Sequence, residues 1–151
     1  MRPDAAPLKL RAEDADDLAV ISACLQDALV PVRDLAYERA ARRFMFVANR
    51  FCWERDSGGD GVPRFERTLC GIAFDEVNGV VFRGFQRSDE DRILCLLAIR
   101  SGEMPGGGPI DLEFAAGATI RLQVGAIRGR ARDLGEPWPT AWLPDHPETL
   151  P

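Results

Sequence analysis

The chain has 151 residues, of which 46% are hydrophobic and 28% are charged, and its formal net charge is −5. This length fits one domain, and the apolar content excludes a wholly disordered chain. The negative charge argues against binding to nucleic acid or to an anionic membrane through a diffuse positive field.

The first predicted elements are a short strand and an amphipathic helix. Apolar and basic residues alternate over 8–11, as in a strand with one buried face. Asp14 then supplies a carboxylate that can cap the first turn of a helix over about residues 14–28. Leu18 and Ile21 belong to a single apolar stripe along this helix, which we expect to pack on a sheet.

Two strands are predicted next. The strand around Pro31 is expected at a sheet edge, because proline cannot donate to the hydrogen-bond ladder. Residues 44–53 predict a long strand whose apolar alternation shifts at Asn49 and Arg50, so we expect a bulge there. The glycine-rich segment 55–63 predicts a surface loop.

Asn78-Gly79 is a strong short-range hairpin signal. Both central positions of a type I′ turn need a positive φ, which asparagine and glycine tolerate. We therefore expect strands over 67–75 and 80–85 to pair with each other across this turn.

Residues 93–99 are apolar at odd and even positions alike, as in a central strand covered on both faces. The predicted helix is the expected cover for one of these faces.

The last predicted hairpin joins residues 110–114 to 120–124, which alternate between apolar and polar side chains. Pairing Phe114 with Ile120 places the apolar groups on one face and sets Glu113 opposite Arg121, with the turn at about residues 116–118.

From Asp133 the chain is rich in proline and acidic residues, so we expect an extended segment, held to the body by Trp138 and Trp142. We place a single domain at residues 1–143 and a proline-rich acidic tail at 144–151.

The cysteines contain no CxxC pair, and each lies in an apolar stretch: Cys24, Cys52, Cys70 and Cys95. Such cysteines are typical of buried free thiols in a reducing compartment. The N-terminal stretch lacks the apolar core of a signal peptide, and the longest apolar run is far shorter than the roughly 20 residues of a membrane span. We therefore expect a cytoplasmic protein that does not contact membranes.

Recognisable catalytic and metal-binding motifs are missing from the sequence. The one histidine, His146, lies in the tail, and the glycines 106–108 lack the lysine that a phosphate-binding loop needs. Clustered Cys and His ligands of the zinc type do not occur. The sequence therefore predicts no catalytic residue, no metal ligand and no cofactor.

Three arginines carry the best candidate for a binding site. Arg128, Arg130 and Arg132 recur at every second position after Gly125, where we expect a bulge. On a strand their side chains would all face one way, and the planar guanidinium fork suits carboxylates and phosphates. The alternative is a solvated face that acidic residues of a neighbouring strand or of the tail neutralise.

Several stretches together resemble an uncharacterised family of alphaproteobacterial proteins, known only as a domain of unknown function. They are residues Leu8–Asp14, Val20–Ala28, Arg42–Phe44, Ala48–Phe51, Leu96–Ile99, Asp133–Gly135 and Pro137–Trp138. The resemblance covers nearly the whole chain and implies a single-domain bacterial cytosolic protein. It supplies no catalytic residues.

We predict an α+β fold: a mostly antiparallel, bent sheet or partly open β-barrel or roll of about six to eight strands, with the N-terminal helix packed on one side. A pleckstrin-homology-like barrel is the alternative. The function favoured is a non-enzymatic binding or protein-interaction module, whose partner is a protein or an anionic small molecule, with a homodimer left open. The alternative function is a small-metabolite enzyme that uses carboxylate and arginine side chains on an anionic substrate.

Overall fold

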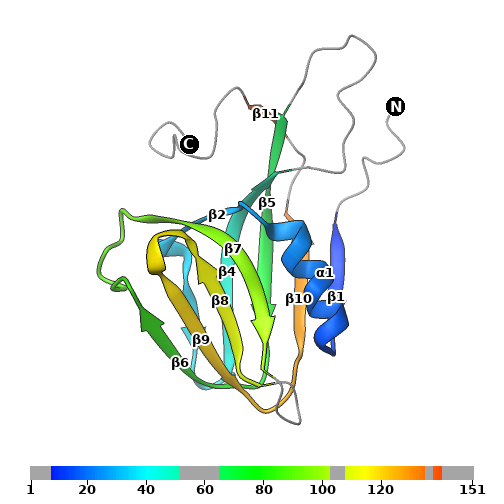
Figure 1. Ribbon diagram of the computed structural model, residues 1–151, viewed down its shortest axis with the longest axis vertical. Helices are drawn as coiled ribbons and strands as arrows, with labels where there is room; N and C mark the ends of the chain where they lie inside the picture. Colours follow the sequence, from blue (N-terminus) through cyan, green and yellow to red (C-terminus); the bar gives the residue numbers. More distant parts are fainter. Residues whose placement is uncertain (1–7, 52–64, 103–107, 135–137, 141–151) are drawn as a thin grey trace.

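The computed structural model describes residues 8–51, 65–102, 108–134 and 138–140. Over these residues one α-helix packs against eleven antiparallel strands, which form a single bent sheet that does not close (Figure 1). The predicted α+β open roll is confirmed. The strands outnumber the expected six to eight, in part because the three-residue strands Ala36–Glu38 and Trp138–Thr140 leave no periodic signal in the sequence. In this described part, no C-terminal helix closes the sheet as a pleckstrin-homology-like barrel requires.

The sheet follows the order β1-β10-β5-β4-β2-β7-β8-β9-β6, with β3 attached to β4 and β11 attached to β5. In chain order the elements are β1 (Lys9–Ala12), α1 (Ala15–Leu25), β2 (Leu29–Pro31), η1 (Val32–Asp34), β3 (Ala36–Glu38), β4 (Arg43–Phe51), β5 (Phe65–Phe74), β6 (Val77–Arg83), β7 (Ile93–Ser101), β8 (Ile110–Phe114), η2 (Ala115–Gly117), β9 (Thr119–Val124), β10 (Gly129–Asp133) and β11 (Trp138–Thr140).

Helix α1 packs against both β1 and β7 (Figure 1). The Asp14 carboxylate caps it by accepting a hydrogen bond from the Asp17 amide at 2.8 Å, as the sequence predicts. Leu18 and Ile21 of the predicted stripe are buried in the core, whereas Cys24 on the same stripe is half-buried. The helix ends at Leu25, about three residues before the predicted end. The Ser22 hydroxyl accepts from the Ile99 amide at 2.8 Å, so the helix satisfies part of the β7 edge that lies beyond β2.

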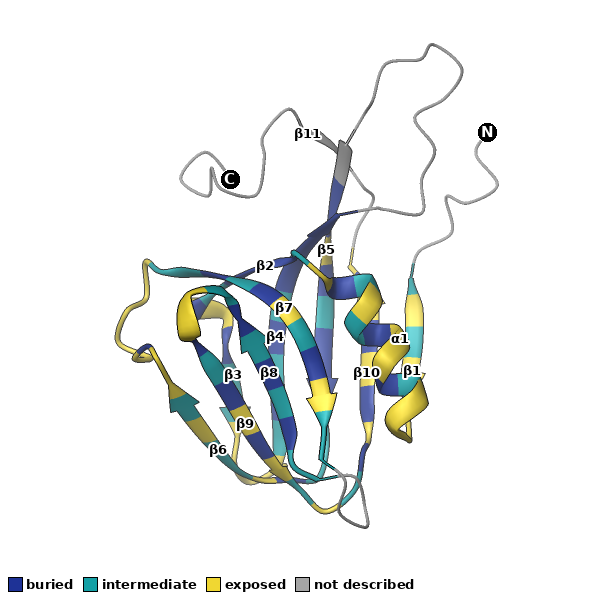
Figure 2. Ribbon diagram, viewed as in Figure 1, coloured by how far each residue is buried: buried dark blue, intermediate teal, exposed yellow. Residues whose placement is uncertain are grey.

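The core lies on the inner face of the roll, where alternate residues of each strand are buried (Figure 2). Phe46, Ile72 and Ala131, from neighbouring strands β4, β5 and β10, pair side by side on this inner face. Their sequence neighbours therefore project to the outer face.

The expected edge position of Pro31 is wrong. Strand β2 pairs with β7 along its length and with β4 through the single pair Leu29 and Asn49. Pro31 is tolerated because it lies at the end of β2, beyond the one residue pair to β4. Through that single pair, β2 connects the two halves of the sheet.

The expected bulge at Asn49 and Arg50 is also wrong, because β4 and β5 stay in register from Phe44 to Phe51. The apolar alternation is interrupted for another reason: both polar side chains are buried. Asn49 accepts hydrogen bonds from Arg67, and Arg50 forms a buried ion pair.

The predicted Asn78-Gly79 hairpin does not form. Strand β6 pairs with β9, whereas β5 pairs with β4, β10 and β11. The chain turns earlier, with Glu76 at a φ of 59°, and Asn78 falls at an irregularity in the pairing with β9. Pairing with a distant strand therefore overrides the local dipeptide preference.

The hairpin of β8 and β9 has the predicted apolar face, but its register differs by two residues. Leu112 pairs with Ile120, and Asp111 rather than Glu113 faces Arg121, to which it is bound at 2.8 Å. The three residues of η2 make the turn, one position earlier than predicted. A shift of two residues keeps every side chain on its face, so alternation alone could not distinguish the two registers.

Strand β7 is central, as predicted, since it pairs with β2 and β8. Its faces are covered only in part, because Leu97 lies at a bulge and is 47% exposed. The extended segment after Asp133 includes β11, which pairs with β5. The predicted loop at 55–63, Trp142 and the tail at 144–151 lie outside the described residues.

Candidate anion-binding site

The three arginines singled out in the sequence project from one face of the chain. Arg128, Arg130 and Arg132 are exposed, whereas the alternating residues Ile127, Gly129 and Ala131 are buried. The three arginines therefore face one way, as predicted. Gly125 lies in the connection between β9 and β10 and not in a strand bulge.

Strand β1 adds two cations that the sequence analysis did not assign to the site. Its register with β10 sets Lys9 opposite Arg132 and Arg11 opposite Arg130. The Asp133 amide donates to the Leu8 carbonyl, so the next pair along, Lys9 and Arg132, is a non-hydrogen-bonded pair. The same holds for Arg11 and Arg130. In such pairs the Cα atoms lie about 4.5 Å apart and the side chains are closest, so two like-charged pairs lie side by side.

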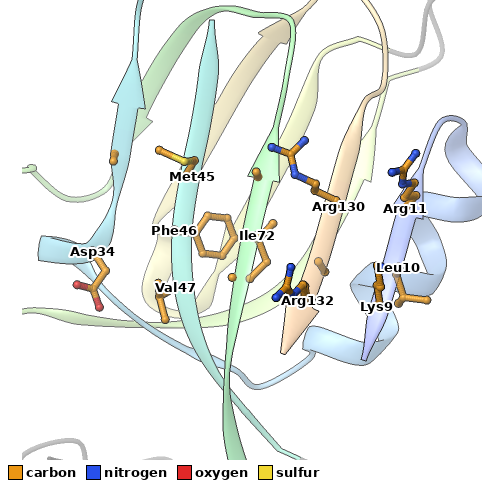
Figure 3. A pocket seen from close by; sticks show the side chains of 14 residues that line it. Lys9, Leu10, Arg11, Asp34, Met45, Phe46, Val47, Ile72, Arg130 and Arg132 are labelled. Atoms are coloured by element: carbon orange, nitrogen blue, oxygen red, sulfur yellow. The ribbon is translucent and has the colours of Figure 1, made fainter. Parts of the chain in front are cut away.

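These four cations form one side of a hollow of about 620 Å³ on the outer face of the sheet (Figure 3). Strands β5, β4 and β3 provide its floor through Gly71, Ala73, Met45, Val47 and Ala36. Asp34 stands on the side opposite the cations (Figure 3). A smaller hollow of about 170 Å³ adjoins it and is lined by residues that include Arg11, Arg128 and Arg130.

Small side chains account for the depth of the hollow. Gly71 lies directly beside Arg132 in the pairing of β5 with β10, and Ala73 lies beside Arg130. The side chain of Leu134 covers part of this floor, because a Cβ atom placed on Gly71 would lie 3.3 Å from Leu134 Cδ2.

Two of the three arginines form ion pairs with the acidic turn after β5. Arg128 binds Glu76 and Arg130 binds Asp75, each at 2.7 Å, and Asp75 also binds Arg43 at 2.7 Å. Burial raises the pKa of Asp75, but the hydrogen bonds and charges of the two arginines outweigh it and hold that pKa below the ordinary value. Asp75 is therefore a fixed anion.

Three of the cations have no carboxylate partner among the residues that the structure describes. Within the described ranges, no acidic side chain lies within ion-pair distance of Lys9, Arg11 or Arg132. Among the described residues, acids of the turn after β5 thus neutralise Arg128 and Arg130, and none of them pairs with Lys9 or Arg132. The acidic tail, the other source of neutralisation considered from the sequence, lies outside those residues.

A buried ion pair on the opposite face of β10 positions this cluster. Arg50 and Asp133 form two hydrogen bonds of 2.9 Å each, and their side chains are 3% and 4% exposed. Asp133 also accepts from the Leu8 amide at 2.8 Å, which fixes the start of β1 against the end of β10. Burial raises the pKa of Asp133, but Arg50 and the Leu8 amide together hold it below its ordinary value.

The described cysteines are free thiols: Cys24 and Cys95 are half-buried and Cys70 is buried. The expectation of buried thiols therefore holds fully for Cys70 alone, and Cys52 lies outside the described residues. Burial raises the pKa of Cys70 to about 12, and the adjacent Asp133 charge adds to this, so the thiol is not a nucleophile near neutral pH. Within the described part of the chain, no cluster of His, Cys, Asp and Glu could hold a metal ion.

Comparison with known proteins supplies a family and no activity. No helix in the described residues has the length and apolarity to cross a bilayer. Neither the curated proteins nor the solved structures contain a match to this chain. One family model, described as a protein of unknown function (DUF2948), matches residues 8–146, so the chain belongs to the DUF2948 family.

Proposed function

We propose that this protein is a non-enzymatic binding module that holds an anionic partner or ligand against Lys9, Arg11, Arg130 and Arg132. These four residues are called the basic cluster below. Arg128 lies next to it and contributes to the positive field at its edge.

The observation that carries the proposal is the cross-strand pairing of like charges. Lys9 faces Arg132 and Arg11 faces Arg130, in the geometry that brings side chains closest. Like charges directly opposite each other destabilise a sheet. Only Asp75, bound to Arg130, offsets the cluster among the described residues. An anion bound between the two strands would remove this repulsion, and arginine offers it a planar pair of donors.

The geometry favours binding over catalysis. The alternative, an enzyme acting on an anionic substrate, needs a carboxylate that can exchange a proton near neutral pH. Asp75 has a lowered pKa and is bound to two arginines, so it anchors the cluster.

An alphaproteobacterial source and a cytoplasmic location complete the proposal, together with a partner that is neither nucleic acid nor membrane. Free thiols at Cys24, Cys70 and Cys95 suit a reducing compartment. The net charge of −5 disfavours nucleic acid as the partner, because a negatively charged protein repels the phosphate backbone and the basic cluster is a local exception to that charge.

Pyrophosphate binding at low ionic strength tests the proposal. Isothermal titration should show binding to the wild type that weakens as salt is added. The double variant Lys9→Gln/Arg132→Gln should bind at least tenfold more weakly. The matched control is Arg83→Gln, at an exposed arginine on β6 that lies outside the hollow. Equal affinity of wild type and double variant would refute the proposal.

A truncation after Leu143 separates ligand binding from internal neutralisation by the acidic tail. If the basic cluster is open to a ligand, the truncated protein should melt at the same temperature and bind pyrophosphate equally or more tightly. A lower melting temperature with unchanged binding would assign the cluster a structural role.

A further inference from the structure

We infer that the occupant is a small amphiphilic anion, with one charged head on the basic cluster and an apolar body across β5 and β4. This inference rests on the proposed function and names the class of ligand that the same site takes.

The floor of the hollow is apolar where water-facing positions of a sheet are ordinarily polar. Val47 pairs with Gly71, and Met45 pairs with both Ala73 and Ala36, so the floor runs without interruption across three strands. All five residues line the hollow. An antiparallel sheet with one solvated face normally alternates apolar and polar residues, so this outer floor departs from the rule.

Two exposed apolar side chains beside the hollow, one on β5 and one just after β10, extend this apolar surface. Leu69 and Leu134 are 42% and 56% exposed, and the Leu134 side chain lies over Gly71 beside the hollow. Contiguous exposed apolar surface of this kind marks a binding region.

Positive charge is confined to one side of the hollow, which fixes the orientation of an anionic ligand. The cations stand on β1 and β10, and Asp34 stands beyond β4 on the opposite side (Figure 3). Neighbouring strands lie about 4.8 Å apart, so the distance from β10 across β5 to β4 is about 10 Å. A ligand with an anionic head and a body of about that length fits, whereas a second anionic end would meet the apolar floor and Asp34.

The shape favours a small molecule over a protein segment or a membrane. A concave hollow of about 620 Å³ falls within the range of small-ligand sites, which are mostly apolar with a few charged groups. An acidic peptide would need cations along its length, and a bilayer surface cannot enter a concave site.

The test compares ligands with one head and different bodies. Octyl phosphate below its micelle concentration should bind the wild type at least tenfold more tightly than methyl phosphate, and 1-octanol should bind more weakly than octyl phosphate. Octanoate should bind more tightly than octanedioate of the same length, because only the second carboxylate distinguishes them. Titration calorimetry on the full chain measures each affinity.

Floor variants separate the apolar body from the charged head. Met45→Gln/Val47→Thr keeps side-chain size at two half-buried positions and should weaken octyl phosphate at least fivefold while leaving methyl phosphate unchanged. Thermal melting checks that the variant folds. Ala73→Leu should likewise weaken octyl phosphate and leave methyl phosphate unchanged, because the larger side chain fills the space that the apolar body would occupy. Arg83→Gln should change neither affinity.

Three outcomes would overturn the inference. If octyl and methyl phosphate bind equally, the basic cluster is a plain anion site, and the proposed function stands without the amphiphile. If neither binds, both proposals fall. If octyl phosphate fails but the protein sediments with vesicles of anionic phospholipid, the surface is a membrane-docking site and the small-ligand assignment is wrong.

Discussion

Gly84 follows the last residue of β6 with a φ of +80°, and a Cβ atom placed on it would clash with the backbone carbonyl of Gly117. Gly79, five residues earlier, has neither constraint: its φ is not positive, and its added Cβ would lie 3.8 Å from Gln123 Cγ, an ordinary contact. The glycine that the backbone requires is therefore not the one in the Asn78-Gly79 pair.

Substitution of the two glycines by alanine should separate them. Gly84→Ala should lower the free energy of unfolding by about 2 kcal/mol or more, because a left-handed backbone and a clash both oppose a side chain. Gly79→Ala should change it by less than about 1 kcal/mol. Urea unfolding measures both. A loss at Gly79 as large as that at Gly84 would indicate that a tight turn exists at Asn78-Gly79 after all.

At the scale of elements, the β1–β10 pair combines an attractive inner face with a repulsive outer one. Leu10 and Ala131 pair on the inner face, whereas Lys9 faces Arg132 and Arg11 faces Arg130 on the outer face. The repulsion is maintained at a sheet end, where β1 pairs only with β10 among the described strands. The like-charged pairs therefore lower the stability of the folded protein, which is common at binding sites.

Arg132→Glu should therefore stabilise the protein without ligand. It replaces a repulsive pair by an attractive one opposite Lys9, and the free energy of unfolding should rise by about 0.5 kcal/mol. Phosphate-bearing ligands should bind the variant at least tenfold more weakly. Arg83→Glu, which changes the net charge equally, is the control for the melting measurement. If Arg132→Glu lowers stability, Arg132 serves an internal partner and the basic cluster is structural.

Sequence periodicity identified elements better than their pairing. It located helix α1, and it gave the facing directions in β8, β9 and β10. It could not choose between registers two residues apart, because Asp111 and Glu113 are equivalent partners for Arg121 on the same face. Partner choice depends on turn geometry and on distant strands, which a local pattern does not encode.

At the scale of the whole molecule, the candidate site exists because the two ends of the described chain meet. Arg130 and Arg132 were predictable from their period-two spacing, but Lys9 and Arg11 join them only through the pairing of β1 with β10. Which face of which sheet they share is a property of topology alone.

Asp133 connects these distant segments from inside the roll. It binds Arg50 of β4 and the Leu8 amide at the start of β1, and it is itself the last residue of β10. The sequence predicts an extended acidic segment from this residue onward, because an aspartate before a proline-rich stretch gives no sign of burial. Its carboxylate and the Arg50 guanidinium are both withdrawn from water, so loss of the Asp133 charge removes two hydrogen bonds and a buried counter-charge from Arg50.

Acid unfolding should depend on Asp133 more than on any other described carboxylate. Because its pKa in the folded protein is held below the ordinary value of 3.8, its ion pair stabilises the fold fully above about pH 4. That contribution is lost as the pH falls through the lowered pKa, so wild-type stability should decline steeply below about pH 4. Asp133→Asn should lower the free energy of unfolding by about 3 kcal/mol at pH 7 and flatten this acid decline.

Asp75→Asn is the matched control, since the pKa of Asp75 is also lowered but its ion pairs are partly exposed. It should cost less than about 1 kcal/mol and leave most of the acid decline in place. Urea unfolding of the three proteins from pH 2.5 to 7 at constant ionic strength measures both effects. If Asp133→Asn declined as steeply as the wild type, the carboxylate would not be ionised in the folded protein. The Arg50 pair could then not be what holds β1 against β10 beneath the basic cluster.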